Sequence, residues 1–182
     1  TITPHGKTKI QRINNQKLQK GEKLLVVTEQ GLGDTLQYMR YIPYLRNQGL
    51  KISFSAQTKL HSLIKASSID QNPLTPEQAE TISEGKWIPL LSIPKYLEIR
   101  PDNVIINKPY IHSTDEFNQK WKDIFSKEKR PIVGINWQGN PEMEKNYQGR
   151  SIPLEEFSIL SDQNKITLLS LQKGFGSEQL DH

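Results

Sequence analysis

The 182-residue sequence contains no cysteine, and only 34% of its residues are hydrophobic. The lack of cysteine excludes a disulfide-stabilised scaffold, a thiolate-ligated zinc site and a catalytic thiol, and it favours a reducing compartment. No apolar run reaches the roughly 18 to 20 residues that span a bilayer, and no apolar stretch follows the basic N-terminal residues as it would in a signal peptide. We therefore expect a soluble, cytoplasmic protein with a small hydrophobic core, folded as one ordinary domain or two small ones.

Excess charge is confined to the beginning of the chain. The formal net charge is +4, and five basic residues and one acid within residues 1–22 account for all of it. The neutral remainder lacks the basic face that binding to a phosphate backbone requires, so no nucleic-acid partner is expected. Residues 1–22, rich in Gln, Asn and Lys, are predicted to form a basic polar arm or linker. No metal site is expected either, because the four histidines share no metal-ligand spacing: His5, His61, His112 and His182.

Regular structure is expected to begin at Lys23. The apolar run 24–27 is typical of a strand buried on both faces, and a glycine turn and a helix over 34–45 follow it. Pro43 inside that helix removes a backbone donor, so a kink or break near Ile42 is predicted. The other elements expected are strands at 50–55, 104–106, 132–137 and 166–171, helices at 57–66, 117–125 and 151–160, a loop or weak helix at 67–85 and a polar loop at 138–150.

The alternation of strands and helices predicts an α/β fold, with a Rossmann-like parallel sheet and flanking helices. Residues 23–127 are predicted to form an N-terminal Rossmann-like domain. Residues 128–182 contain only two expected strands, which would leave an open edge and little buried area. We therefore interpret this second segment as the start of another Rossmann-like domain, a partial C-terminal domain.

The glycine turn carries the first candidate site. Gly31, Gly33 and Asp34 follow the first expected strand, but the turn is not the dinucleotide fingerprint, because Leu36 stands where the third glycine would be. Asp34 has two interpretations. It could cap the helix, with Gln37 completing a capping box, or it could act as a general base at the carboxyl edge of a parallel sheet, where such folds bind ligands.

A second set of candidates lies in the polar loop after residue 137. Arg150 closes this loop just before an expected helix, where its guanidinium could hold a diphosphate; the alternative is an ordinary exposed arginine. Trp137, followed by Gly139 and Asn140, could present a ring and amides to a sugar or base. The alternative is that Trp137 ends a buried strand as a core residue.

Several segments in order carry a family resemblance: 29–38, 40–45, 91–94, 133–141, 150–152 and 170–172. This set, spread over residues 23–176, resembles the glycosyltransferase region that follows tetratricopeptide repeats in many bacterial proteins. That region is similar to the heptosyltransferase-type, family 9 glycosyltransferases. The resemblance implies the GT-B architecture, with the acceptor on the first Rossmann-like domain and the nucleotide-sugar donor mostly on the second.

The resemblance also assigns roles to residues. Asp34 matches the catalytic base of heptosyltransferases, and Arg150 stands where that family places a basic residue on the donor phosphates. The implied reaction is inverting and metal-independent, with a nucleotide-sugar as co-substrate, no other cofactor, and a glycan or protein as acceptor. The residues expected to bind substrate or donor are Gly31, Gly33, Gln37, Trp137, Gly139, Asn140, Arg150, Gln172 and Gly174.

The sequence departs from the family in length. Family members continue into a later glycine-rich segment that holds the nucleotide, and tetratricopeptide repeats usually precede the domain. We therefore expect a fragment of a longer protein whose upstream part carries such repeats. A non-catalytic binding or interaction module derived from the same fold is the alternative. A small nucleotide-binding enzyme of another kind is disfavoured by the absent third glycine.

Overall fold

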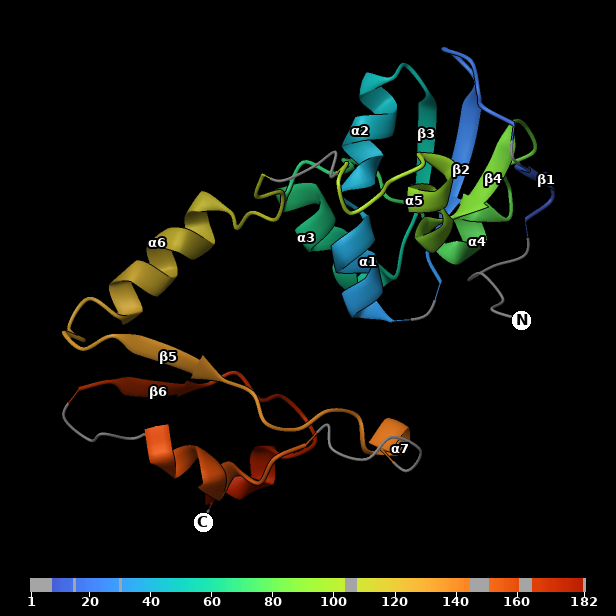
Figure 1. Cartoon of the computed structure of the whole chain (residues 1–182). Helices are drawn as coiled ribbons and strands as arrows, with labels where there is room; N and C mark the ends of the chain where they lie inside the picture. The colour runs from blue at the N-terminus through green and yellow to red at the C-terminus, as the bar shows by residue number, and fades with distance from the viewer. Residues whose placement is uncertain are drawn as a thin grey trace. The chain divides into compact units, whose positions relative to one another are not determined.

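The computed structural model describes residues 8–14, 16–29, 31–103, 108–144, 151–160 and 165–181 (Figure 1). The chain divides into two compact units, Thr1–Asn118 and Gln119–His182. Within the described part of the chain, none of the helices combines the length and the apolar character needed to cross a membrane.

The first unit contains a four-stranded parallel sheet, which confirms the predicted α/β, Rossmann-like fold. Its strands run in the spatial order β1-β4-β2-β3. Leu24 to Val27 of β2 are at most 2% exposed, as predicted for a strand covered on both faces. The bounds are β1 Gln11–Arg12, β2 Lys23–Val27, β3 Lys51–Ser55 and β4 Lys86–Pro89.

Helices cover both faces of this sheet (Figure 1). Val26 of β2 and its register partners Phe54 and Ile88 face a large apolar cluster, to which the helices on one face contribute. The apolar cluster on the opposite face is smaller, and there Ala79 of α4 (Pro76–Ala79) packs on Leu25. The elements on the first face are α1 Leu32–Tyr38, α2 Tyr41–Asn47, the 3-10 turn η1 Thr58–Leu60, α3 His61–Ala66, the 3-10 turn η2 Leu90–Ser92 and α5 Ile93–Tyr96.

The predicted break in the first helix is confirmed, and it lies at Met39 and Arg40. Pro43 has no N–H to donate to the carbonyl of Met39, and its ring would clash with that carbonyl in a continuous helix. The chain ends α1 at Tyr38 and restarts at Tyr41 instead. Pro43 then falls in the first turn of α2, where a backbone N–H would have no helical partner in any case.

Two strands were not foreseen. Folded structure begins before Lys23, because β1 pairs with β4, the backbone N–H of Ile13 donates to Trp87 O at 2.8 Å, and Ile13 is 7% exposed. The expectation that structure begins at Lys23 is therefore wrong. β4 was not predicted from the sequence either. The strand predicted at 104–106 lies outside the described residues.

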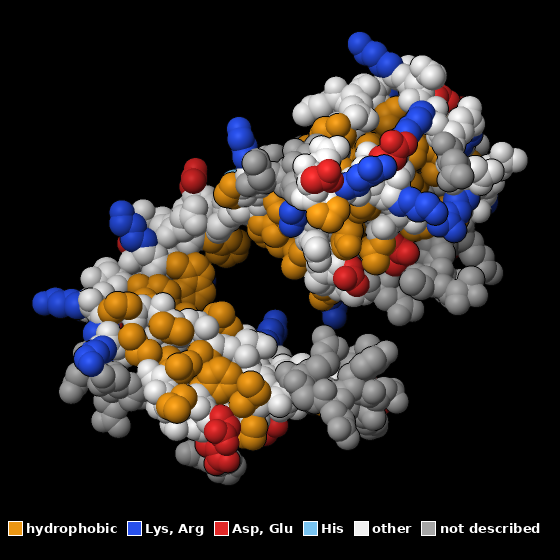
Figure 2. Space-filling model, in the orientation of Figure 1, with side chains coloured by type: hydrophobic (Ala, Val, Ile, Leu, Met, Phe, Trp, Pro, Cys, Tyr) orange, Lys and Arg blue, Asp and Glu red, His pale blue; other side chains and the backbone are white. Residues whose placement is uncertain are grey.

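The second unit is small, and much of its apolar surface is exposed (Figure 2). Two parallel strands form its sheet, as the sequence predicted. Among its described residues, the buried apolar side chains are Ile135 and Trp137. The predicted helix over 151–160 is instead a 3-10 segment. The bounds are α6 Asp115–Ile124, which crosses into this unit, β5 Ile132–Ile135, α7 Pro141–Glu144, η3 Leu154–Leu160, β6 Thr167–Ser170 and η4 Ser177–Asp181.

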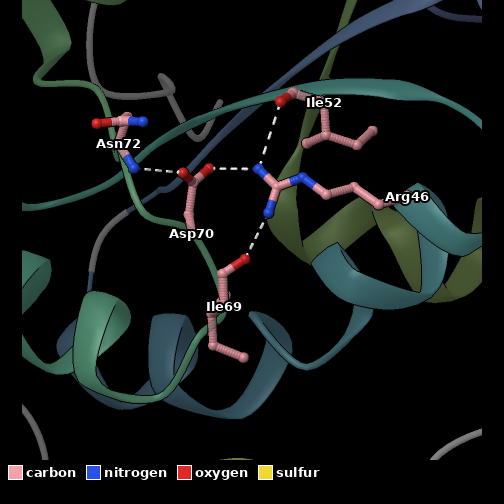
Figure 3. Close-up of polar contacts among 5 residues, drawn as sticks. All are labelled: Arg46, Ile52, Ile69, Asp70 and Asn72. Carbon is pink, nitrogen blue, oxygen red and sulfur yellow. Dashed lines mark hydrogen bonds and ion pairs between the residues drawn. The ribbon is translucent and has the colours of Figure 1, made fainter.

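An ion pair holds three segments of the first unit together (Figure 3). Arg46 of α2 donates to the carboxylate of buried Asp70 at 2.5 Å and to the carbonyls of Ile69 and Ile52. Asp70 also accepts the backbone N–H of Asn72 at 2.8 Å. Because the guanidinium is satisfied by several acceptors, it fixes α2 against β3 and against the loop after α3.

Candidate functional site

The strand order creates a switch point at the carboxyl end of β2. The chain leaves β2 toward β3 on one side and then returns to β4 on the other side. In open parallel sheets, ligands bind outside the carboxyl ends of the strands at such a point. Here residues 28–34 follow β2, and η2 follows β4.

A buried carboxylate ties these two segments together. Glu29 is 7% exposed, and its Oε2 accepts the backbone N–H of Leu91 at 2.9 Å. Its backbone carbonyl accepts Nε2 of Gln57, which follows β3, at 3.1 Å. Glu29 therefore links the carboxyl ends of β2, β3 and β4.

Thr35 extends this network to the glycine turn. Its hydroxyl is buried and lies 2.9 Å from Oε1 of Gln57 and 3.3 Å from the carbonyl of Gly31. A single hydroxyl hydrogen serves one acceptor at a time, and Gln57 is the nearer one. None of Glu29, Thr35 and Gln57 was predicted as a site residue. A charged residue two positions after the buried run of β2 was the signal that could have drawn attention to Glu29.

The turn presents Asp34 to solvent. Gly31 is the N-cap residue of α1, with φ of 84°, so Asp34 is the third residue of the helix and makes no capping hydrogen bond. The alternative that Asp34 caps the helix is therefore wrong. A Cβ on Gly31 would lie 2.7 Å from Oδ2 of Asp34, so any larger residue at this position would displace the carboxylate. Gly33 and Gln37 are exposed beside it.

The side chain of Asp34 is accessible to a bound group. Its side chain is exposed, and among the described residues no hydrogen bond or ion pair occupies it. A carboxylate so placed can accept a proton from a bound hydroxyl group. Across the described ranges, no group of three or more His, Cys, Asp and Glu side chains is arranged to hold a metal ion.

In the second unit, the predicted donor residues lie around the carboxyl ends of β5 and β6. Trp137 is 2% exposed, and its indole N–H donates to Gly176 O at 3.0 Å. The amide of Gln172 accepts the backbone N–H groups of Trp137 and Gln138 at 3.1 and 3.0 Å, and it donates to Gln138 O and Phe175 O. The ring of Trp137 is thus placed as core, and the amide of Gln172 bridges the two strand ends.

The remaining predicted residues of this unit are more accessible. Gly139, Asn140 and Gly174 are exposed; Gly139 donates its N–H to Ser151 Oγ at 3.3 Å, and Asn140 accepts the N–H of Glu142 at 3.1 Å. Arg150 lies outside the described residues.

Comparisons with family models, with curated proteins and with solved structures returned no match for this chain.

Proposed function

We propose that the chain is a glycosyltransferase-like protein in which Asp34 is the catalytic base. It is supported by the segments that resemble, in order, the glycosyltransferase region, by the parallel sheet of the first unit, and by the position of Asp34 at the switch point of that sheet. The sugar would come from a nucleotide-sugar, and the acceptor would be a hydroxyl of a glycan or protein.

The single observation that supports this function best is that Asp34 is exposed and stands beside a hydrogen-bonded network. The carboxylate is exposed and unoccupied within the described residues, while Glu29 and Thr35, which flank the glycine turn, are both hydrogen-bonded to Gln57. A general base needs both an accessible oxygen and a rigid support. A merely solvated surface carboxylate needs no such support.

The proposed reaction is a single displacement. Asp34 takes the proton of the acceptor hydroxyl while that oxygen attacks the anomeric carbon from the face opposite the leaving group. The bond between the anomeric carbon and the phosphate oxygen breaks, and the nucleoside diphosphate leaves with its bonding electron pair. Arg150 would stabilise the charge that develops on the diphosphate.

The first experiment is calorimetric titration of the chain with UDP, GDP, ADP and CDP and with their sugars. We expect saturable binding of one nucleotide, weakened in Arg150→Ala and unchanged in Arg100→Ala, a matched change at an exposed arginine. Absence of binding by any nucleotide in a folded sample would refute a transferase function for this chain.

The second experiment tests the base. With the donor that binds, release of the nucleoside diphosphate is measured in the presence of a mixture of glycan acceptors. Asp34→Asn should lower turnover about 10²- to 10⁴-fold, because it removes the proton acceptor, while donor affinity is retained. Asp115→Asn, a change of an exposed acid in the first turn of α6, is the control. Unchanged turnover in Asp34→Asn would show that Asp34 is not the catalytic base.

A non-catalytic binding module is the second candidate, and the apolar surface of α6 favours it. Phe117, Trp121 and Ile124 are 52%, 49% and 53% exposed, and their i, i+4, i+7 spacing places them on one face of the helix. Exposed apolar patches often mark interaction surfaces. This candidate predicts that the nucleotide screen fails and that Asp34→Asn changes no binding property.

A further inference from the structure

A cleft of about 550 Å³ opens beside β4, between the N-terminal segment and α5. Arg12 of β1 and Asn14 and Lys17 from the segment after it line one side. Ser92 of η2 and Lys95 of α5 line the other, together with Glu98 just beyond that helix. We call this the basic cleft, and Figure 2 shows Lys and Arg side chains gathered over the part of the first unit that holds α5 and β4.

The charges in the basic cleft are unbalanced. Three cations line it against one acid, Glu98, which pairs with Lys17 at 3.2 Å. No acidic side chain of the described residues pairs with Arg12 or Lys95. The cleft therefore keeps a local excess of positive charge in a chain whose body is neutral.

Aromatic rings lie against two of these cations, Arg12 and Lys17; Lys17 is also paired with Glu98 and donates to the carbonyl of Tyr96. The guanidinium of Arg12 lies over the ring of Trp87, 5.6 Å from its centroid, and its Nη2 is 3.4 Å from Ser92 Oγ. Lys17 Nζ lies 5.0 Å from the centroid of the Tyr96 ring. Stacking occupies the face of a guanidinium and leaves most of the N–H donors on its edge available to an anion.

We propose that the basic cleft binds the phosphoryl group of a small phosphorylated ligand. Its donors come from β1, the following segment, η2 and α5, and so approach from different directions. That arrangement suits the tetrahedral oxygens of a phosphoryl group better than the two coplanar oxygens of a carboxylate. The volume lies within the range of sites for nucleotide-sized ligands. This site does not depend on the proposed transferase function, because it uses neither Asp34 nor Arg150.

Glu98 limits the affinity of the basic cleft. Glu98 lies just beyond α5 with φ of 57°, a conformation that glycine adopts more easily, and its N–H donates to Lys95 O at 3.1 Å. Its carboxylate repels an incoming anion and engages Lys17. Removing this charge should therefore strengthen anion binding, a gain that damage to the fold would not produce.

The test is an NMR titration of the ¹⁵N-labelled chain with inorganic phosphate and pyrophosphate at constant ionic strength. We expect saturable amide shifts confined to residues 12–17 and 92–98. Arg12→Gln and Lys95→Gln should weaken binding about tenfold or more, and Glu98→Gln should tighten it several-fold. Lys65→Gln is the matched control, because Lys65 is exposed in the last turn of α3 as Lys95 is in α5.

Three results would overturn the proposal: shifts spread over all basic residues without saturation, equal weakening by Lys65→Gln, or citrate binding as tight as that of pyrophosphate. Amide spectra of each variant report whether it is folded. Arg150→Ala should leave these shifts unchanged, so failure here stays distinguishable from failure of the donor site.

Discussion

At the scale of single residues, two neighbouring glycines in the turn before α1 differ in what their backbone requires. Gly31 has φ of 84°, and a Cβ there would meet Oδ2 of Asp34 at 2.7 Å. Gly33 lies inside α1, and a Cβ there would meet nothing within 4 Å. The first glycine therefore holds the shape of the candidate site, whereas the second does not.

This difference predicts opposite effects of the same substitution. Gly31→Ala should destabilise the chain by about 1–2 kcal/mol, the cost of a left-handed conformation for a residue with a Cβ, and it should displace the Asp34 carboxylate. Gly33→Ala should be neutral or stabilising by about 0.4–1 kcal/mol, because it restricts the unfolded chain. Urea unfolding followed by circular dichroism measures both. Equal effects of the two substitutions would contradict the assigned roles.

At the scale of elements, the sequence predicted those helices and strands that depend on neighbouring residues alone. The apolar run of β2 and the break caused by Pro43 were both recognisable in the sequence. β1 has two residues, and β4 begins with Lys86 and ends with Pro89, so neither shows an apolar run or an alternation. Both exist through pairing in a sheet formed by distant segments. The candidate site divides in the same way. The glycine turn and Asp34 were predicted, but Glu29 depends on a contact with Leu91 that no local pattern shows.

The connection between α6 and β5 provides a prediction for acidic solution. The guanidinium of Arg130 donates hydrogen bonds to the carboxylate of Glu128, and so does the hydroxyl of Thr167. These bonds, above all the one from Arg130, hold the pKa of Glu128 well below the ordinary 4.5. A lowered pKa in the folded state contributes stability above the unfolded value, and this contribution is lost as the pH falls. The second unit should therefore lose stability progressively below about pH 5.

The measurement is the indole N–H resonance of Trp137, which reports on the second unit, followed in urea at several pH values. Glu128→Gln should flatten the pH dependence, because a neutral amide cannot titrate. Glu155→Gln, a change of an exposed acid in η3, is the control and should retain it. A wild-type slope that survives in Glu128→Gln would show that another group is responsible.

At the scale of the whole molecule, the two units differ in what holds them together. The sheet of the first unit carries a continuous apolar cluster on one face and a smaller one on the other. In the second unit, the described residues include two buried apolar side chains, Ile135 at 8% and Trp137 at 2% exposure, and its sheet has two strands. Since burial of apolar surface is the main favourable term in folding, the first unit should hold most of the stability.

Native-state hydrogen exchange makes this difference measurable. Amides of β2 and β4 should exchange only through global unfolding of the first unit, whereas those of β5 and β6 should exchange through openings of lower free energy. Increasing urea should accelerate exchange in β2 and β4 steeply and in β5 and β6 weakly, because the smaller opening exposes less surface. Trp137→Ala should accelerate exchange in β5 and β6 and leave β2 unaffected. Equal opening free energies for β2 and β5 would instead mean that the two units unfold as one cooperative structure. The stability of the second unit would then depend on more than its own two strands.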